Sequence, residues 1–337
     1  MRRWTKKLCT AALAALTALA AAGCKSQTEP LSRSGIYFDT TVTLTIYGAE
    51  KETDREGLLD ACFSMCEDYE ELLSRTVEGS DIYRINHSAG EPTEVSEETA
   101  ALIGKALEYS RLTDGVFDCT IAPLSELWNF HGEDPQKPDG PAIERALSHV
   151  GYENVTIEGT TVTLKDPEAA LDLGGIAKGY IADRLNGFLE KSGVTGALID
   201  LGGNILALGE KADGQPFRVG IRRPFSDGND SIAAVELRGQ SLVTSGVYER
   251  CFEEDGVLYH HLLNPEDGFP FTNGLLSVTI LCPSSADADA LATCCFGLGQ
   301  EAGLRLIESL KDTEALFITE DYELHTSSGF PLDSRGQ

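Results

Sequence analysis

Residues 171–184 read LDLGGIAKGYIADR, an apolar segment that ends in an aspartate and passes through two glycines into an amphipathic helix. We expect a strand over 168–173 and a helix after the glycines, where apolar residues recur at helical spacing. Gly174 and Gly175 tolerate positive φ and let backbone amides approach a ligand closely. The free N–H groups at the helix N-terminus, together with Lys178, suit a phosphate. A tight turn without a ligand is the alternative, since the spacing matches neither a Walker A loop nor a Rossmann fingerprint.

The rest of the chain mixes helical and strand-like patterns without a strict strand–helix–strand order. Apolar residues at helical spacing predict helices, and alternating apolar and polar residues predict strands. The expected helices are 55–73, 97–112, 143–149, 286–298 and 300–310, and the expected strands include 38–47, 153–157, 161–164, 196–201, 204–208, 217–221, 232–238, 241–244, 259–263, 276–282 and 315–319. This interleaving favours an α+β fold with mixed, largely antiparallel sheets and flanking helices.

The N-terminus predicts an export signal over residues 1–23, because a basic start precedes an apolar run that is too short to span a bilayer. Small residues then lead into Cys24, as at bacterial lipoprotein cleavage sites where the cysteine is lipidated; ordinary secretion is the alternative. We expect 24–34 to be a flexible tether and 35–330 to be one folded unit. The protein is therefore expected to be exported and lipid-anchored on the extracytoplasmic face of a membrane.

Charge and cysteine content narrow the range of partners. The formal net charge of −27 disfavours nucleic acid and anionic lipid surfaces as partners. Such a chain needs local lysines, backbone amides or a metal to hold a polyphosphate. Once Cys9 in the signal and Cys24 are set aside, an odd number of cysteines remains, with no C-x-x-C pair. This favours small buried thiols over a disulfide framework.

A second candidate site lies on the expected helix 286–298. Asp289 and Thr293 are spaced i, i+4, so both oxygens share one helix face. Such a pair, completed by backbone carbonyls and phosphate oxygens, suits Mg²⁺, although a surface or capping role is the alternative. The motif DLGG also occurs twice, at 172–175 and 200–203, as an internal duplication or as two similar turns.

A third candidate site contains two adjacent histidines, His260 and His261. Neighbouring residues of a strand face opposite ways, so we expect one histidine to reach a site while the other faces solvent. A histidine beside a phosphate can accept a proton near neutral pH. A strand histidine with only a local hydrogen bond is the alternative.

Gathered in order, these segments resemble the ApbE family of FAD:protein FMN transferases, over nearly all of 35–330. The likeness is carried by YFDTTVTLTIY (37–47), SDIYRIN (80–86), GVFDCTIAPLSELWNF (115–130), LDLGGIAKGYIADRL (171–185), ALIDLGGNILALG (197–209), TSGVYERCF (244–252), YHHLLNPEDGFP (259–270) and ADALATCCFGLG (288–299). It implies an ApbE-like, T-fold-related α+β architecture. It also implies an enzyme that takes FAD as substrate and, with Mg²⁺, transfers FMN to a threonine of an acceptor protein, releasing AMP. The implied acceptors are flavin-carrying subunits of Rnf- and Nqr-type redox complexes and related FMN-binding domains.

The resemblance assigns roles residue by residue. Asp289 and Thr293 would hold Mg²⁺ with a backbone carbonyl of residues 175–177, which we take at Gly175. The residues that would line FAD are Phe38, Val116, Phe117, Asp118, Asp172, Lys178, His261 and Leu263. His261 and Asp289 are the expected catalytic residues, with His261 or a nearby carboxylate as the base. Phe38, Phe117 and Tyr248 are available for an apolar flavin slot. Asn264 replaces the aspartate of most relatives and should keep the turn while altering its charge.

Two other functions fit the same residues. An FAD pyrophosphatase would use water in place of the acceptor and yield FMN and AMP. A non-catalytic flavin-binding lipoprotein would bind FAD tightly and release no AMP when Mg²⁺ is present. Adding an acceptor peptide that carries a flavinylation threonine distinguishes transfer from hydrolysis.

Overall fold

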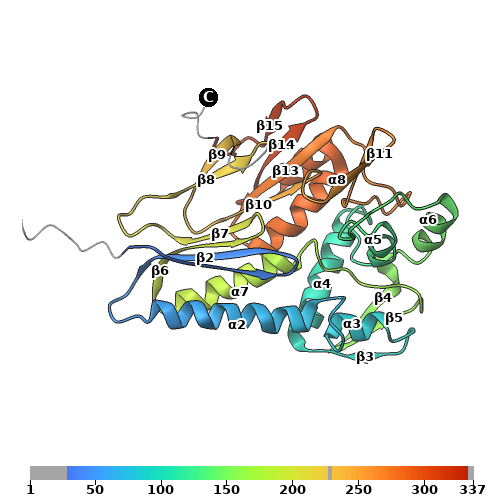
Figure 1. Cartoon of the computed structure of the whole chain (residues 1–337), viewed down its shortest axis with the longest axis horizontal. Helices are drawn as coiled ribbons and strands as arrows, with labels where there is room; N and C mark the ends of the chain where they lie inside the picture. The colour runs from blue at the N-terminus through green and yellow to red at the C-terminus, as the bar shows by residue number, and fades with distance from the viewer. Residues whose placement is uncertain (1–28, 227–229, 333–337) are drawn as a thin grey trace, which may run out of the picture.

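The computed structural model describes residues 29–226 and 230–332, which are built on an eight-stranded sheet (Figure 1). The strand order is β1-β2-β6-β7-β10-β13-β14-β15, and every neighbouring pair is antiparallel. The strands are β1 (Leu31–Tyr37), β2 (Thr40–Ala49), β6 (Val194–Leu201), β7 (Asn204–Gly209), β10 (Ser241–Gly246), β13 (Leu275–Cys282), β14 (Glu314–Thr319) and β15 (Leu324–Thr326). This confirms the expected α+β class with largely antiparallel sheets.

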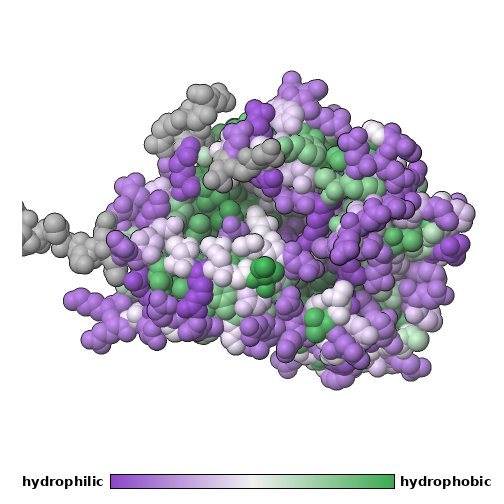
Figure 2. Space-filling model, viewed as in Figure 1, coloured by the Kyte–Doolittle hydropathy of each residue, from purple (hydrophilic) through white to green (hydrophobic). Residues whose placement is uncertain are grey.

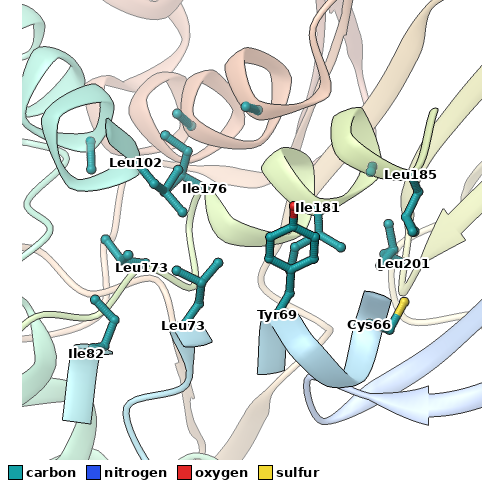
Figure 3. Close-up of a cluster of buried hydrophobic side chains, with 14 of the residues drawn as sticks. Cys66, Tyr69, Leu73, Ile82, Leu102, Leu173, Ile176, Ile181, Leu185 and Leu201 are labelled. Atoms are coloured by element: carbon teal, nitrogen blue, oxygen red, sulfur yellow. The ribbon is translucent and has the colours of Figure 1, made fainter. Parts of the chain in front are cut away.

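Three long helices cover one face of the sheet: α2 (Arg55–Leu73), α7 (Ala177–Lys191) and α8 (Ser285–Ser309) (Figure 1). Each buries an apolar stripe at helical spacing. Figure 3 shows the result between α2, α7 and the sheet, where Tyr69, Ile181 and Leu201 point into one interior. The expected break in the last long helix is confirmed, because Gly299 adopts φ 77°, ψ 172° within α8.

The centre of the sheet is covered on both faces. All eight residues of β13 are buried, as its nearly continuous apolar sequence LLSVTILC indicates. Helix α8 packs on one side, and the ribbon of β8 (Phe217–Arg222) and β9 (Ser231–Leu237) lies on the other (Figure 1). The sheet is therefore a rigid platform for the segments that leave its strand ends.

A further long helix and several shorter elements form a lobe beside the sheet, at the right of Figure 1. They are α3 (Asp81–Asn86), β3 (Thr93–Glu94), α4 (Glu97–Leu112), α5 (Ala122–Trp128), α6 (Gly140–Leu147), the 3₁₀ turn η1 (Tyr152–Asn154), β4 (Val155–Glu158), β5 (Thr161–Leu164), β11 (Cys251–Glu254) and β12 (Val257–His260). Fully buried Trp128 donates its indole N–H to the Gly268 carbonyl at 2.9 Å. This bond ties α5 to the loop that follows β12.

The prediction of a strand over 168–173 is wrong, because a side chain takes the place of a neighbouring strand. Asn86 accepts the Leu171 N–H at 2.7 Å and donates to the Leu171 carbonyl at 2.9 Å. The Asp172 N–H donates to the Cys119 carbonyl at 2.8 Å, and only a single bridge joins Ala170 to Ile121. The segment is extended but belongs to no sheet.

The N-terminal strand begins earlier than expected. Strand β1 starts at Leu31, inside the predicted tether 24–34, so that prediction extends too far. The chain then turns at Phe38 and Asp39, which both have positive φ (54° and 56°), before β2. The predicted export signal and Cys24 lie outside the described residues. Within the described ranges, no helix has the length and apolar character needed to cross a membrane.

The cysteines behave as the sequence predicts. The seven in the described ranges are all free, and six of them are buried. Burial raises the pKa of the Cys62 thiol to about 12, so this group stays protonated and packs as a small apolar side chain.

Candidate active site

One cavity of about 350 Å³ collects the segments that the sequence singled out. Its walls come from the turn after β1, residues 116–118, the start of α7, the end of β10, the loop after β12 and the first turns of α8. Figure 2 shows a mostly hydrophilic surface that is hollowed near the middle of this face. Segments far apart in the sequence therefore meet at one site.

Helices α7 and α8 cap each other beside this cavity. Asp289 Oδ2 of α8 accepts the Gly179 N–H of α7 at 2.9 Å. In return, the Asp183 carboxylate of α7 accepts the N–H groups of Ser285 and Ala286 at 2.8 and 3.0 Å. A Cβ at Gly179 would lie only 2.1 Å from the Ser285 carbonyl oxygen, so glycine is required for this close approach. The reciprocal capping fixes the two helix N-termini relative to each other.

The predicted metal-binding residues lie together. Asp289 is 4% exposed, and its Oδ1 accepts no hydrogen bond within the described part of the chain. Thr293 Oγ1 lies 3.4 Å from Ser245 Oγ and 3.5 Å from the position of a Cβ built on Gly175. A free carboxylate oxygen, a hydroxyl and loop backbone at one point form the oxygen donor set that Mg²⁺ accepts, with the remaining positions left for water or phosphate. Among the described residues, no cluster of three or more His, Cys, Asp or Glu side chains offers another metal site.

Lys178 places a cation at the same point. Its Nζ donates to the Gly174 carbonyl at 2.9 Å and lies 3.8 Å from Asp289 Oδ1. Neither Gly174 nor Gly175 uses the positive φ that glycine tolerates. Gly175 instead allows close packing, since a Cβ there would lie 3.0 Å from the Phe117 ring and push the ring back. Because residues 174 and 175 have no side chains, the loop backbone, Lys178 and Asp289 can pack closely together.

The two histidines do not both have the environments that were predicted. His261 lines the cavity, and its Nδ1 is buried without a hydrogen-bond partner. Burial, reinforced by the positive charge of Arg250, lowers the pKa of His261 to about 3, so the ring is neutral at physiological pH. His260 does not face solvent as expected: it is 5% exposed and bonds the Phe271 carbonyl through Nε2 at 3.0 Å. Its partner lies on the loop after β12, which curls back over the histidine and encloses it.

The predicted flavin-binding residues Val116, Phe117, Asp118, Asp172 and Leu263 all line the cavity. The two carboxylates are already engaged in local structure. Asp118 accepts the backbone N–H groups of Thr120 and Tyr152, at 2.7 and 2.9 Å. Asp172 Oδ1 accepts the Gly174 N–H at 2.8 Å, and its Oδ2 lies 3.3 Å from Arg75 Nε. Both aspartates therefore shape the loops that form the wall.

Phe38 and Tyr248 are not among the residues that line the cavity, although their neighbours in the sequence do line it. Asp39 and Thr40, directly after Phe38, do line it. The Phe38 N–H donates to Glu70 Oε1 at 2.8 Å, which holds the turn against α2. Asn264 keeps its turn as expected, because its Oδ1 accepts the Glu266 N–H at 3.0 Å.

Several lining residues were not predicted as site residues. Arg75, His131, Asn204 and Arg250 line the cavity, and Arg250 falls inside TSGVYERCF, so the motif could have indicated it. Asn204 follows the second DLGG, where Gly202 and Gly203 have φ 64° and 91° and turn β6 into β7. The first DLGG has no positive φ and leads into a helix, so the two copies are similar sequences with different structures.

Comparison with known proteins identifies relatives of this chain. The chain matches the model of the ApbE family over residues 38–317. It is 38% identical to the FAD:protein FMN transferase of Klebsiella pneumoniae (strain 342), covering 92% of this chain and 97% of that protein. It is 34% identical to the FAD:protein FMN transferase of Treponema pallidum (strain Nichols), covering 93% and 91%.

Solved structures of ApbE proteins are also similar to this chain. The fold is similar to that of the ApbE protein from Thermotoga maritima, with a TM-score of 0.82 and 32% identity over 89% of this chain and 97% of that one. It is also similar to the flavin transferase ApbE from Vibrio cholerae, with a TM-score of 0.80 and 30% identity over 90% and 98%. The similarity therefore extends over most of this chain, which includes both the sheet and the lobe.

Proposed function

Because this chain belongs to the ApbE family and is a flavin transferase, we propose that it transfers FMN from FAD to a threonine of an acceptor flavoprotein subunit, releasing AMP. The observation that carries the proposal is the meeting of Asp289, Thr293, Lys178 and His261 around one cavity. An oxygen donor pair, a fixed cation and a neutral imidazole are the groups that phosphoryl transfer to a hydroxyl requires.

The pyrophosphate of FAD would fit beside the start of α7, where Lys178 and the positive end of the helix dipole offer positive charge. Asp289 Oδ1, Thr293 Oγ1 and backbone near Gly175 would hold Mg²⁺. Bound there, the metal would neutralise charge on the phosphates and on the departing AMP. Lys178 lies at the same point and would orient the pyrophosphate. The hydrogen bonds by which α7 and α8 cap each other hold these groups in fixed positions.

His261 is the candidate proton acceptor for the threonine hydroxyl, which is a poor nucleophile by itself. The pKa of His261 is low in this structure, because the ring is buried beside Arg250 and Lys178. A pyrophosphate next to these cations would offset their charge and raise the pKa of the ring. The base would thus gain strength when the substrate is in place.

Partners and location form the second part of the proposal. The acceptors would be flavin-carrying subunits of Rnf- or Nqr-type redox complexes or related FMN-binding domains. The export signal over 1–23 and a lipid at Cys24 would place the enzyme on the extracytoplasmic face of the membrane. Two experiments test the anchor. Processing of the wild-type protein should be sensitive to globomycin, and Cys24→Ala should move the protein from the membrane to the soluble fraction.

The variant Asp289→Asn tests the metal assignment. Asparagine can still accept the Gly179 N–H through its amide oxygen, but an NH₂ group replaces the second carboxylate oxygen and cannot bind a metal ion. We expect Mg²⁺-dependent turnover to fall by at least about 100-fold, equivalent to about 2.7 kcal/mol, while the melting temperature stays within a few degrees. Glu301→Gln, at an exposed position of the same helix, is the matched control. Wild-type turnover in Asp289→Asn would remove Asp289 from the site.

Acceptor labelling distinguishes transfer from the two alternatives. AMP and a flavin-labelled acceptor indicate the transferase, AMP with free FMN indicates an FAD pyrophosphatase, and FAD binding without AMP indicates a flavin-binding protein. His261→Ala should slow labelling more than it weakens FAD binding; a loss confined to binding would make His261 a contact and not a base.

A further inference from the structure

Arg250 is a partly buried cation at the cavity wall. It lies between β10 and β11, and its carbonyl accepts the His261 N–H at 3.1 Å, which places it beside the candidate base. In the described part of the chain, no side chain hydrogen-bonds its guanidinium or lies within 4.0 Å as an ion-pair partner. Arg75, on the same wall, is by contrast paired with Glu126 at 3.1 Å and with Asp172 at 3.3 Å.

A partly buried guanidinium without acceptors is costly for the folded protein. Its donors are partly removed from water without receiving acceptors, and burial lowers the pKa of Arg250 although Asp39, Asp172 and Glu249 lie near enough to oppose the shift. A guanidinium presents five N–H donors in a fork that matches two oxygens of a phosphate or carboxylate. The missing partner is therefore an anionic oxygen pair from a ligand.

The position of Arg250 indicates which anion it would bind. Lys178 and Arg250 both act on the His261 ring, so positive charge reaches the same imidazole from the first turn of α7 and from the segment between β10 and β11. This pair of cations stands out in a chain whose formal net charge is −27. Two cations flanking one point suit a ligand with two linked anionic groups, which is the chemistry of a pyrophosphate.

We propose that Arg250 binds phosphate oxygens of the FAD pyrophosphate, on the same cavity wall as Lys178, and is a specificity-determining residue for dinucleotide over unphosphorylated flavin. This inference rests on the proposed function, which supplies FAD as the ligand. The bound anion would supply the acceptors that the protein does not give this guanidinium.

The test compares FAD and riboflavin, which share the flavin ring but differ in the pyrophosphate. Binding is measured by flavin fluorescence in EDTA, so that no turnover intervenes, for wild type, Arg250→Gln, Arg250→Lys and the exposed control Arg305→Gln. We expect Arg250→Gln to weaken FAD by roughly 10- to 100-fold and riboflavin by less than about 2-fold. Arg250→Lys should recover part of the FAD affinity, and Arg305→Gln should match wild type.

Thermal melting of the ligand-free proteins provides the second readout. Because the guanidinium is unpaired, Arg250→Gln should melt at the wild-type temperature or above it. Equal FAD affinity in Arg250→Gln and wild type would overturn the inference. It would do so even if the variant had a higher KM for the acceptor. A lower melting temperature with equal losses of FAD and riboflavin would show a structural role and also overturn it. Wild type that binds no FAD would instead refute the proposed function.

Discussion

His260 should make folding stability depend on pH in a way that one substitution removes. Its Nδ1 accepts the Leu262 N–H at 3.3 Å and its Nε2 lies 3.0 Å from the Phe271 carbonyl, so the ring is neutral with its proton on Nε2. A second proton would displace the Leu262 N–H inside an enclosed site. Burial accordingly lowers the pKa of His260 from 6.5 to about 4.

The size and sign of the effect follow from this shift. The unfolded chain takes up a proton on His260 below about pH 6.5, whereas the folded chain does so only near pH 4. The contribution to stability is complete above pH 6.5 and is lost as the pH falls toward 4, by about 1.4 kcal/mol per pH unit and about 3 kcal/mol in all.

Urea unfolding of wild type and His260→Gln at pH 7 and pH 5 measures this contribution. Glutamine can still donate to the Phe271 carbonyl but does not titrate. Between the two pH values, wild type should lose about 2 kcal/mol more stability than the variant. His87→Gln, at an exposed histidine, should follow wild type. The same pH dependence in His260→Gln and wild type would refute the reasoning.

Three further changes test how the site is supported. Gly179→Ala should lower the free energy of unfolding by about 1–3 kcal/mol, because its Cβ would meet the Ser285 carbonyl, while Gly187→Ala, with open space on the same helix, should raise it by about 0.5–1 kcal/mol; urea unfolding of both decides. Asp183→Ala should cost about 1–2 kcal/mol and weaken Mg²⁺ binding measured by calorimetry, since the Ser285 and Ala286 N–H groups at the start of α8 lose their acceptor; unchanged stability and binding would contradict the reciprocal capping. Asn86→Ala should cost about 1–3 kcal/mol and speed amide exchange at Leu171, and wild-type exchange there would show that the side chain does not hold the segment.

Local patterns in the sequence were sufficient to predict the long helices. Helices α2 and α4 have the bounds that were expected, because an Asp54 or Ser96 cap precedes a regular apolar stripe in each. The pairing of Asp289 and Thr293 was also predictable, since i, i+4 spacing alone puts both on one helix face.

Features that depend on distant residues could not be predicted in this way. The segment before Gly174 has the composition of a strand, but Asn86, far away in the chain, occupies the place of its neighbour. Residues 31–34 have the polar composition of a tether, and their pairing with β2 across the turn at Phe38 and Asp39 is a property of the folded chain. The motif TSGVYERCF could have indicated that Arg250 belongs to the site, but that its guanidinium is unpaired is a property of the folded cavity.

The central claim is the transfer of FMN, and the intact mass of an acceptor tests it most directly. The leaderless protein is incubated with FAD, Mg²⁺ and an FMN-binding domain that a known relative labels under the same conditions, with a parallel sample in EDTA. The account predicts that the acceptor gains the mass of one covalently attached FMN, that AMP appears in equal amount, and that EDTA abolishes both. AMP without a change in acceptor mass, while the relative labels the same domain, would contradict it.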